Sequence, residues 1–382
     1  TELCSAYGQS LIIRIIYLRI MERIIILTYD YSPNNGGIAR LCKEIVKQCI
    51  LTKTDYLVVT NIDGPAEKNV ERIVGWRGIV EFKILHFLKK NRKKGDVILT
   101  GLFHPDGMIG LLSGIPCCFL AHGAELMSGE GFFRKHIWSY YRKIILSKSP
   151  KVIANSDYTR NLVKKCSPFA NVIALPLAVD NEYFHPTKDK PNDDILHLCS
   201  ISRLEQFKGH DFIINTIAEL PEIYRNKIRL TIGGKGPYKE YLEKLAKEKG
   251  LQEIVSFVGF VSDDQLRDFY SENDVFILCT REDHSTNHVE GFGLVFTEAQ
   301  ACGTPCIGTR TGGIPDAIDK GNGGWLIKQD DQNALSDLLI SLISDKSLLK
   351  KQSELALYRV NTTCNWSLYF KDLKQILSKI IT

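Results

Sequence analysis

The side chains best suited to chemistry lie in one short stretch, Val289 to Gly303 (VEGFGLVFTEAQACG). Gly291 and Gly293 leave the backbone bare just before an apolar helical run, and the N–H groups at such a helix start bind anions such as a diphosphate. Glu290 precedes the helix and Glu298 lies one turn inside it, about 10 Å away if the rise is helical. Two carboxylates at that separation are predicted to hydrogen-bond hydroxyl groups at opposite ends of one elongated ligand. The alternative is a capped helix with solvated acids.

Two cations could balance the charge of a diphosphate. Arg203 ends a predicted strand in the segment SISRL, and Lys208 opens the following helix after a turn. An arginine fork and a lysine ammonium can together neutralise the charge that develops on a leaving group without a metal ion. No Asp-x-Asp motif follows a strand, so we predict that the site needs no metal and no further cofactor. Either cation alone is also compatible with an ordinary surface position.

Several glycines directly follow predicted strands. Gly37 opens the first helix, and Gly234 lies in IGGKGPYKEYL, between a strand and a helix. Such glycines let backbone N–H groups approach a phosphate or a sugar, or they serve only the turn itself. A dinucleotide-binding fingerprint would require G-x-G-x-x-G in the first unit, and neither segment contains it.

Histidines are the remaining candidates. His122 ends an apolar strand predicted at 116–121, which brings its imidazole to the end of a sheet; a core histidine without a catalytic role is the alternative. His284 and His288 are four residues apart, the spacing of two metal ligands on a helix. The polar segment around them (REDHSTNHVE) favours a flexible substrate loop over a zinc site.

The elements that position these residues alternate along the chain. Short apolar runs separate longer segments with the period of amphipathic helices, which predicts parallel sheets covered on both faces. The fold class is therefore α/β, with two doubly wound domains that carry ligands at the carboxyl ends of their strands and face a central cleft. The runs expected to form strands are 24–28, 56–59, 97–100, 117–121, 152–154, 195–201, 228–232, 254–257, 275–279 and 305–307.

Breaks in this pattern set the domain boundaries. The Pro, Asp and Lys content of 181–194 marks a linker, so the first domain is assigned to residues 21–185 and the second to 186–365. Residues 366–382 form a terminal helix.

Residues 1–20 contain an apolar run with two arginines that is too short to span a bilayer, and they lack a cleavage site. We expect translation to begin at Met21 and these residues to be a non-native extension; an amphipathic surface anchor is the alternative.

Composition supports a cytoplasmic globular protein. With 382 residues and 44% hydrophobic content, the chain is large enough for two cores. Its 11 cysteines form no C-x-x-C pair and lie partly inside apolar runs, which is typical of buried thiols in a reducing compartment. This pattern argues against a disulfide framework and a zinc site.

Taken in order, the motifs resemble those of retaining glycosyltransferase family 4, also called glycosyltransferase group 1, whose members have the GT-B fold of two Rossmann-like domains. The resemblance runs from about residue 22 to 325, and its most specific part is the E-x7-E element with the two cations. One departure is Leu177-Ala178, which replaces the commoner Asn-Gly and puts the local turn in doubt. The matching pieces are Gly36-Gly37, His122-Gly123, Pro176 to Asp180, Ser202 to Leu204, Lys208-Gly209, Gly234-x-Gly236-Pro237, Gly259 to Val261, Glu290 to Ala299, Gly303-x-Pro305 and Gly312 to Pro315.

The resemblance implies a role for each candidate residue. Arg203 and Lys208 would bind the diphosphate of a nucleotide sugar, Glu298 its ribose and Glu290 its sugar, while His122 would lie near the reacting centre. The catalytic set would then be His122, Glu290, Arg203 and Lys208. The remaining donor-binding residues would be Gly37, Gly234, Gly291, Phe292, Gly293, Leu294 and Val295. The terminal helix would cross back onto the first domain.

Charge points to the acceptor side. The net charge is +5, but residues 1–180 carry 25 Lys and Arg against 15 Asp and Glu. The segments Lys83 to Lys94 and Arg134 to Lys151 mix cations with aromatic and aliphatic residues, as helices lying on an anionic membrane do; ordinary amphipathic helices are the alternative. We expect transfer of a hexose from a GDP- or UDP-linked sugar to a glycan or lipid-linked acceptor in polysaccharide or lipopolysaccharide synthesis. The protein would be cytoplasmic, with peripheral contact at the inner membrane face.

Two other functions fit parts of the pattern. A GT-B nucleotide-sugar epimerase would use the same donor site without an acceptor, and product analysis would distinguish it. A nucleic-acid- or membrane-binding protein would use the basic front half. No nucleic-acid-binding module is recognisable, and the basic residues alternate with core positions, so we predict no nucleic-acid partner.

Overall fold

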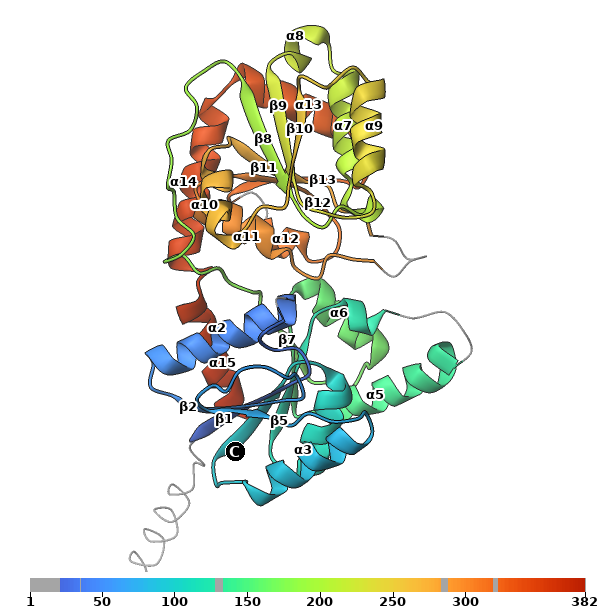
Figure 1. Ribbon diagram of the computed structural model, residues 1–382, viewed down its shortest axis with the longest axis vertical. Helices are drawn as coiled ribbons and strands as arrows, with labels where there is room; N and C mark the ends of the chain where they lie inside the picture. The colour runs from blue at the N-terminus through green and yellow to red at the C-terminus, as the bar shows by residue number, and fades with distance from the viewer. Residues whose placement is uncertain (1–20, 35, 128–132, 283–287, 319–321, 382) are drawn as a thin grey trace, which may run out of the picture.

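The computed structural model describes residues 21–34, 36–127, 133–282, 288–318 and 322–381. The predicted extension 1–20 and His284 lie outside these ranges. The chain forms two domains stacked along the long axis of the molecule, each built on one parallel sheet (Figure 1). Within the described part of the chain, no helix combines the length and the apolar character needed to cross a bilayer.

The first sheet has seven strands in the order β3-β2-β1-β4-β5-β6-β7. Its strands form because runs of Ile, Val, Leu and Cys are buried on both faces; all six residues of β1 and all five of β5 are buried. The strands are β1 (Arg23–Thr28), β2 (Asp55–Thr60), β3 (Val70–Arg72), β4 (Asp96–Thr100), β5 (Cys117–Ala121), β6 (Lys151–Ala154) and β7 (Val172–Ala174). The helices are α2 (Gly37–Leu51), α3 (Ile79–Lys90), α4 (Met108–Ser113), α5 (Ser139–Lys148) and α6 (Asp157–Cys166).

The second sheet has six strands in the order β10-β9-β8-β11-β12-β13. The strands are β8 (Leu196–Ile201), β9 (Ile228–Gly233), β10 (Val255–Gly259), β11 (Val275–Leu278), β12 (Cys306–Thr309) and β13 (Gly324–Ile327). The helices that follow them are α7 (His210–Glu219), α8 (Glu222–Arg225), α9 (Lys239–Glu248), α10 (Asp263–Ser271), α11 (Leu294–Ala301), α12 (Ile314–Ile318) and α13 (Gln332–Ser344).

Both sheets reverse their winding direction once. In the first sheet the reversal lies between β1 and β4, and in the second between β8 and β11. Ligands of doubly wound sheets bind at the carboxyl ends of the strands beside this reversal, because the connections leave in opposite directions and open a crevice there. Gly37 follows β1 and Arg203 follows β8, so both lie at such a point.

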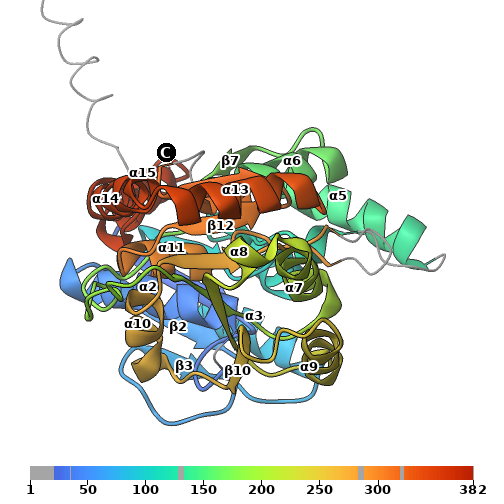
Figure 2. The same cartoon turned by 90° about the horizontal axis from the view of Figure 1, so that it is seen from above.

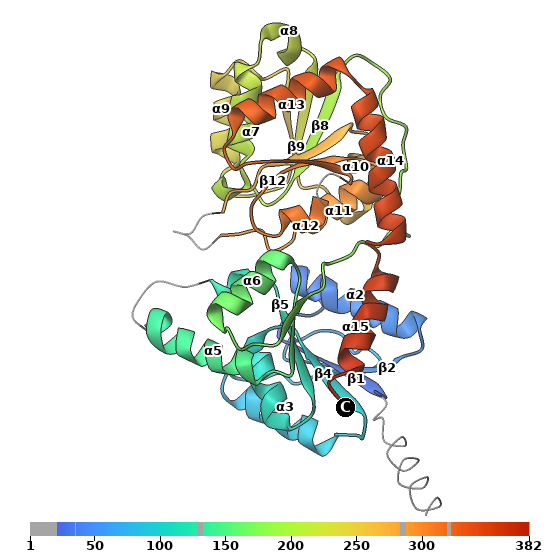
Figure 3. The ribbon, with the colours of Figure 1, turned by 180° about the vertical axis from the view of Figure 1, so that it is seen from behind.

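The chain crosses between the domains twice. It first crosses before β8, and it returns between α14 (Ser347–Thr362) and α15 (Trp366–Ser378), as the view from behind shows (Figure 3). The backbone N–H of Val179 donates to Cys364 O at 3.2 Å and so ties the two crossings together. α15 packs on α2 of the first domain, where Trp366 is buried in the same apolar cluster as Leu41. Seen from above, α14 and α15 lie along one side of the molecule (Figure 2).

The Leu177-Ala178 segment and most of the cysteines are buried. The departure Leu177-Ala178 lies in an irregular segment after β7 that buries both side chains, and Asp180 after it is paired with Lys47 of α2. The ten cysteines of the described ranges are free thiols, and all but Cys166 are buried.

Candidate active site

Lys208 and Glu290 form an ion pair near the carboxyl end of β8 in the second domain. Lys208 ends a short helical turn after β8, and its Nζ lies 2.8 Å from Oε2 of Glu290, which precedes α11. Both side chains are mostly buried, with 15% and 19% of their surface exposed. The ammonium also lies 4.9 Å from the ring centroid of Phe207. Two residues that the sequence assigned to one ligand are thus brought into direct contact.

Arg203 and Glu298 line a second part of the site. Together with Gly234, Val261 and Tyr270 they surround a pocket of about 460 Å³ beside β8. Arg203 is 74% exposed and contacts Glu205 through Nε at 3.0 Å, so its guanidinium remains accessible to a ligand. Val295 lines the same pocket. Lys208, Glu290 and His122 do not line it, so the predicted residues form two neighbouring groups rather than one ring.

Glu298 is held from both domains. It is 7% exposed, and its Oε2 accepts a hydrogen bond from the Tyr270 hydroxyl at 3.1 Å. Arg40 reaches across from α2, with Nη1 3.9 Å from Glu298 Oε1 and Nη2 3.2 Å from Asp263 Oδ1. Burial raises the pKa of Glu298 above its ordinary value, and Arg40 works against this shift by favouring the carboxylate.

Arg40 and Tyr270 were not predicted from the sequence. Arg40 lies in the first turn of the helix that Gly37 opens, which is the end of a helix that faces a ligand. Its position in the first turn of this helix was the one sequence feature that could have identified Arg40. Tyr270 lies on α10 among core residues and carried no signal of its own.

The glycine segment before α11 contacts the first domain. α11 begins at Leu294, with Gly293 as its N-cap at φ +94° and no side-chain cap, so its first N–H groups have no capping side chain. A Cβ added to Gly291 would lie 2.0 Å from the carbonyl oxygen of His122, which explains why only glycine fits there. The Ser156 hydroxyl donates to Gly291 O at 2.8 Å. Phe292 is 2% exposed and belongs to the core, so only its backbone can face a ligand.

His122 lies at the carboxyl end of β5, as predicted from its strand. Its Nε2 is 2.9 Å from the carbonyl oxygen of Gly101, which can only accept, so Nε2 carries a proton. The backbone N–H of His122 donates to Glu125 Oε1 at 2.7 Å. His122 therefore lies close to Gly291 across the domain boundary.

Gly37 lies in the first domain and Gly234 in the second, and the space around them differs. Gly37 is exposed, and an added Cβ would meet no atom within 4 Å. Gly234 differs, because its φ of +124° and the Ser202 oxygen only 1.9 Å from an added Cβ leave no room for a side chain. The backbone at Gly234 is therefore pressed against the strand end that carries Arg203.

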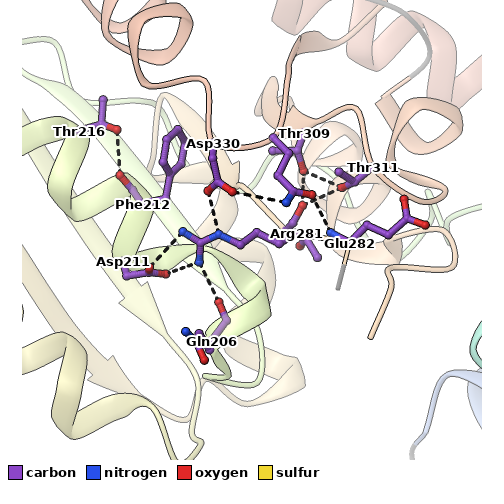
Figure 4. Close-up of polar contacts among 11 residues, drawn as sticks. Gln206, Asp211, Phe212, Thr216, Arg281, Glu282, Thr309, Thr311 and Asp330 are labelled. Carbon is purple, nitrogen blue, oxygen red and sulfur yellow. Dashed lines mark hydrogen bonds and ion pairs between the residues drawn. The ribbon is translucent and has the colours of Figure 1, made fainter. Parts of the chain in front are cut away.

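Arg281 is a structural cation that sequence analysis missed. It follows β11, and its guanidinium donates to both carboxylate oxygens of Asp211 at 2.9 and 3.1 Å and to Asp330 at 2.8 Å (Figure 4). The adjacent Glu282 N–H donates to Gln329 at 2.9 Å. The Tyr158 hydroxyl of the first domain bonds to the Glu282 carboxylate, so this network fixes a second contact between the domains.

The histidine pair gives no metal site among the described residues. His288 is stacked on Phe207, with ring centroids 4.7 Å apart, whereas His284 lies outside the described ranges. No group of three or more His, Cys, Asp or Glu side chains in the described part of the chain is arranged to hold a metal ion.

Comparisons with known proteins agree on family and fold. Residues 182–357 match the family model of glycosyl transferases group 1. The chain is 25% identical over 354 residues to the GDP-mannose-dependent alpha-(1-6)-phosphatidylinositol monomannoside mannosyltransferase of Mycobacterium tuberculosis, covering 85% of this chain and 90% of the relative.

Two solved structures show the same arrangement of domains. HepE of Anabaena in complex with UDP and glucose matches with a TM-score of 0.72 at 17% identity, covering 94% of this chain and all of the other. WaaG, a glycosyltransferase involved in lipopolysaccharide biosynthesis, matches with a TM-score of 0.68 at 18% identity, covering 93% and 99%. The predicted GT-B fold is confirmed. Residues 182–357 thus carry a group 1 glycosyltransferase domain, and the chain as a whole is similar to glycosyltransferases of this group.

Proposed function

We propose that this glycosyltransferase moves a hexose from a GDP- or UDP-linked sugar to a hydroxyl group of a glycan or lipid-linked glycan. The setting would be the synthesis of cell-surface polysaccharide or lipopolysaccharide. The observation that carries the proposal is the pocket beside β8, whose lining includes both exposed Arg203 and buried Glu298. A cation and a carboxylate in one pocket suit a molecule that carries both a phosphate and a ribose.

The donor would lie across both groups of residues. Its ribose hydroxyls would hydrogen-bond to Glu298, its diphosphate would lie between Arg203 and the N–H groups that begin α11, and its sugar would reach Glu290 and His122. Lys208, whose Nζ lies 2.8 Å from Glu290 Oε2, would contact both the sugar-binding carboxylate and the departing phosphate. The relative from Mycobacterium tuberculosis, which uses GDP-mannose, and HepE, solved with UDP and glucose, support a nucleoside-diphosphate donor.

Transfer would proceed with retention at the anomeric carbon. The bond between that carbon and the phosphate oxygen breaks, and its electron pair goes to the phosphate. The acceptor oxygen then forms its bond on the same face and passes its proton to the departing phosphate. Arg203 and Lys208 would stabilise the negative charge that develops, which is the role of a metal ion in other transferases. We propose that the reaction is metal-independent on this ground.

The acceptor would approach from the first domain. α3 and α5 carry exposed lysines together with exposed apolar side chains such as Phe82 and Tyr140, whereas Arg142 of α5 is buried; the exposed combination suits peripheral contact with an anionic membrane surface. The name of the mycobacterial relative, which includes a phosphatidylinositol glycolipid, supports an acceptor held at a membrane.

Nucleotide binding provides the first test. Thermal shift of the full chain against UDP, GDP, ADP and CDP, with and without EDTA, should show stabilisation by one nucleotide that the chelator does not change. Arg203→Ala and Glu298→Ala should abolish it. Arg229→Ala is the matched control, because Arg229 is exposed in the same domain but lies on β9, away from the pocket. A wild type that none of the four nucleotides stabilises would refute the proposal.

Product analysis provides the second test. The nucleotide sugar that corresponds to the stabilising nucleotide is incubated with glycan and glycolipid acceptors, and the product linkage is determined by NMR. An α-linked product from an α-linked donor supports retention. Conversion of the nucleotide sugar to an epimer without any acceptor would identify an epimerase instead.

A further inference from the structure

The first domain has an apolar groove that the proposed function does not use. It runs between α3 and α4, has a volume of about 330 Å³, and is lined mainly by apolar side chains. We call it the α3–α4 groove and define it by Phe82 and Leu85 of α3 and Met108, Ile109 and Leu112 of α4. In Figure 1, α3 lies on the part of the first domain that is turned away from the second domain.

Large apolar side chains of the groove lining and of the segment that begins α3 are exposed to solvent. Phe82 is 75% exposed and Leu112 is 56% exposed. Just before α3, Trp76 is 86% exposed, and Ile79 in its first turn is 58% exposed. Isolated exposed apolar residues need no explanation, but a contiguous group around a groove marks a binding surface.

Charge around the groove selects the kind of partner. The segment from Lys83 to Lys94 contains no acidic residue, and its cations are exposed; they are Lys83, Lys89, Lys90, Arg92, Lys93 and Lys94. Arg77 lines the end of the groove where α3 begins. Glu81, the acidic residue in the lining, accepts a hydrogen bond from the Gly78 N–H at 2.5 Å and so caps the helix. An apolar slot with Arg77 in its lining and a basic helix beside it is complementary to an anionic lipid.

The position of the groove links it to the proposed acceptor site. His104 lines the same end as Arg77, three residues after Gly101, whose carbonyl oxygen binds the His122 ring. Its Nδ1 is 2.8 Å from the Tyr141 hydroxyl, and its ring meets the edge of Trp138. These contacts hold His104, and with it one part of the groove lining, against the α5 region. A phosphate at Arg77 would lie near the residues that follow β4, where Gly101 contacts His122.

We propose that the α3–α4 groove binds one hydrocarbon chain of an anionic lipid-linked acceptor. The acceptor's phosphate would lie at Arg77, and the cations between Lys83 and Lys94 would contact the surrounding membrane. This inference rests on the proposed function, because it names the class of acceptor that the enzyme would use. It makes the groove a binding site for a single chain of limited length, which differs from adsorption of a whole surface to a membrane.

Chain length gives the sharpest test. Binding of n-alkyl phosphates with six to fourteen carbons, below their micelle concentrations, is measured on the full chain by calorimetry and tryptophan fluorescence. Affinity should rise about fourfold for each added methylene, because each one leaves water, and then level off when the groove is full. Matching alkyl glucosides, which lack the phosphate, should bind more weakly. Absence of saturable binding, or a rise without a plateau, overturns the proposal.

Variants locate the site. Met108→Trp fills the groove and Leu112→Asn makes its wall polar; each should weaken decyl phosphate binding at least tenfold. Ile223→Asn is the matched control, since Ile223 on α8 is 70% exposed but lies in the second domain. Met108→Trp should retain binding to vesicles of phosphatidylglycerol and phosphatidylcholine while losing the alkyl phosphates. Equal losses in the control, or vesicle binding by the wild type with no alkyl phosphate binding, would refute the groove.

The nucleotide experiment separates the two proposals. If the stabilising nucleotide still raises Tm in Met108→Trp and Leu112→Asn, both variants are folded and the donor site is intact. Nucleotide binding without groove binding refutes only this inference. Alkyl phosphate binding by a chain that starts at Met21, but not by the full chain, would show that the preceding residues occupy the groove, and would also refute it.

Discussion

The two domains share a topology but differ in how their cations are paired. In the second domain Arg281 contacts two carboxylates and Lys208 is paired with Glu290, while Arg203 stays 74% exposed. In the first domain the cations of α3 are exposed and lie beside exposed apolar side chains. Paired, buried charges hold one geometry, which suits a small rigid ligand. Exposed cations on flexible side chains suit a broad and variable surface. Both domains have the same kind of fold, so their loops and helix faces determine what each domain binds.

The largest effect should come from breaking the engaged pair. Lys208→Ala removes the ammonium that would stabilise the departing phosphate, and it leaves Glu290 unpaired. We expect kcat to fall about 10²–10³-fold, the usual loss for one preorganised donor. Lys244→Ala, at a lysine side chain that is 75% exposed on α9, is the control and should leave kcat unchanged. Equal rates for Lys208→Ala and the wild type would show that the pair is only structural.

Backbone fit in the second domain should rank next. Gly234→Ala places a Cβ 1.9 Å from the Ser202 oxygen at a φ of +124°, so we expect a loss of about 3 kcal/mol in unfolding free energy and loss of nucleotide binding. Gly250→Ala is a matched comparison, because it has a φ of +70° with no atom near an added Cβ. It should cost about 1 kcal/mol. Urea unfolding of both variants measures the difference, and equal losses would contradict the close approach.

The contact across the cleft should give a smaller, pH-dependent effect. Arg40 favours the ionised form of Glu298, whose pKa burial raises. Nucleotide binding through the ribose needs the carboxylate, so affinity should fall as the pH falls through this pKa. Arg40→Ala should raise that pKa further and shift the fall to higher pH, with up to about tenfold weaker binding on the acid side of the profile. Titration of Kd from pH 5 to 8 tests this, and Arg160→Ala, at an exposed pair on α6, serves as the control. A pH profile of Kd that does not shift in Arg40→Ala would show that Arg40 does not act on nucleotide binding through Glu298.

The smallest effect should come from the partner of Glu298 in its own domain. Tyr270→Phe removes one hydroxyl donor, 3.1 Å from Oε2, and keeps the ring packed. A single hydrogen bond of this kind contributes about 1 kcal/mol, so we expect a two- to tenfold rise in nucleotide Kd. The effect should persist in Arg40→Ala, since the two groups contact different oxygens. A loss larger than that of Arg40→Ala would show that the second domain alone controls this carboxylate.

The sequence predicted the regular parts of the fold well, because buried parallel strands are short runs of apolar residues. Three edge strands, β3, β7 and β13, were not predicted, since each is short and only partly buried. The order of strands within each sheet also cannot be read from a local pattern.

Site residues were predictable where a motif is local. Lys208 and Glu290 were assigned to one ligand from their own segments, and the structure places them in contact. Arg40 and Arg281 were not found, because their partners lie in distant segments and become neighbours only after folding. Phe292 shows the opposite difficulty: its glycine neighbours suggested a ligand, yet its side chain is in the core.

The return of α15 to the first domain means that this domain is not a continuous piece of the sequence. A fragment that stops before Trp366 would leave the apolar face of α2 uncovered, including Leu41 and Ile45, and should aggregate. A single cut in the linker 181–194 would not release the halves, because the peptide between α14 and α15 still joins them. Swapping acceptor domains between relatives by exchanging only the front half would therefore produce mismatched helix packing, and successful chimaeras must carry the last helix together with the first 180 residues.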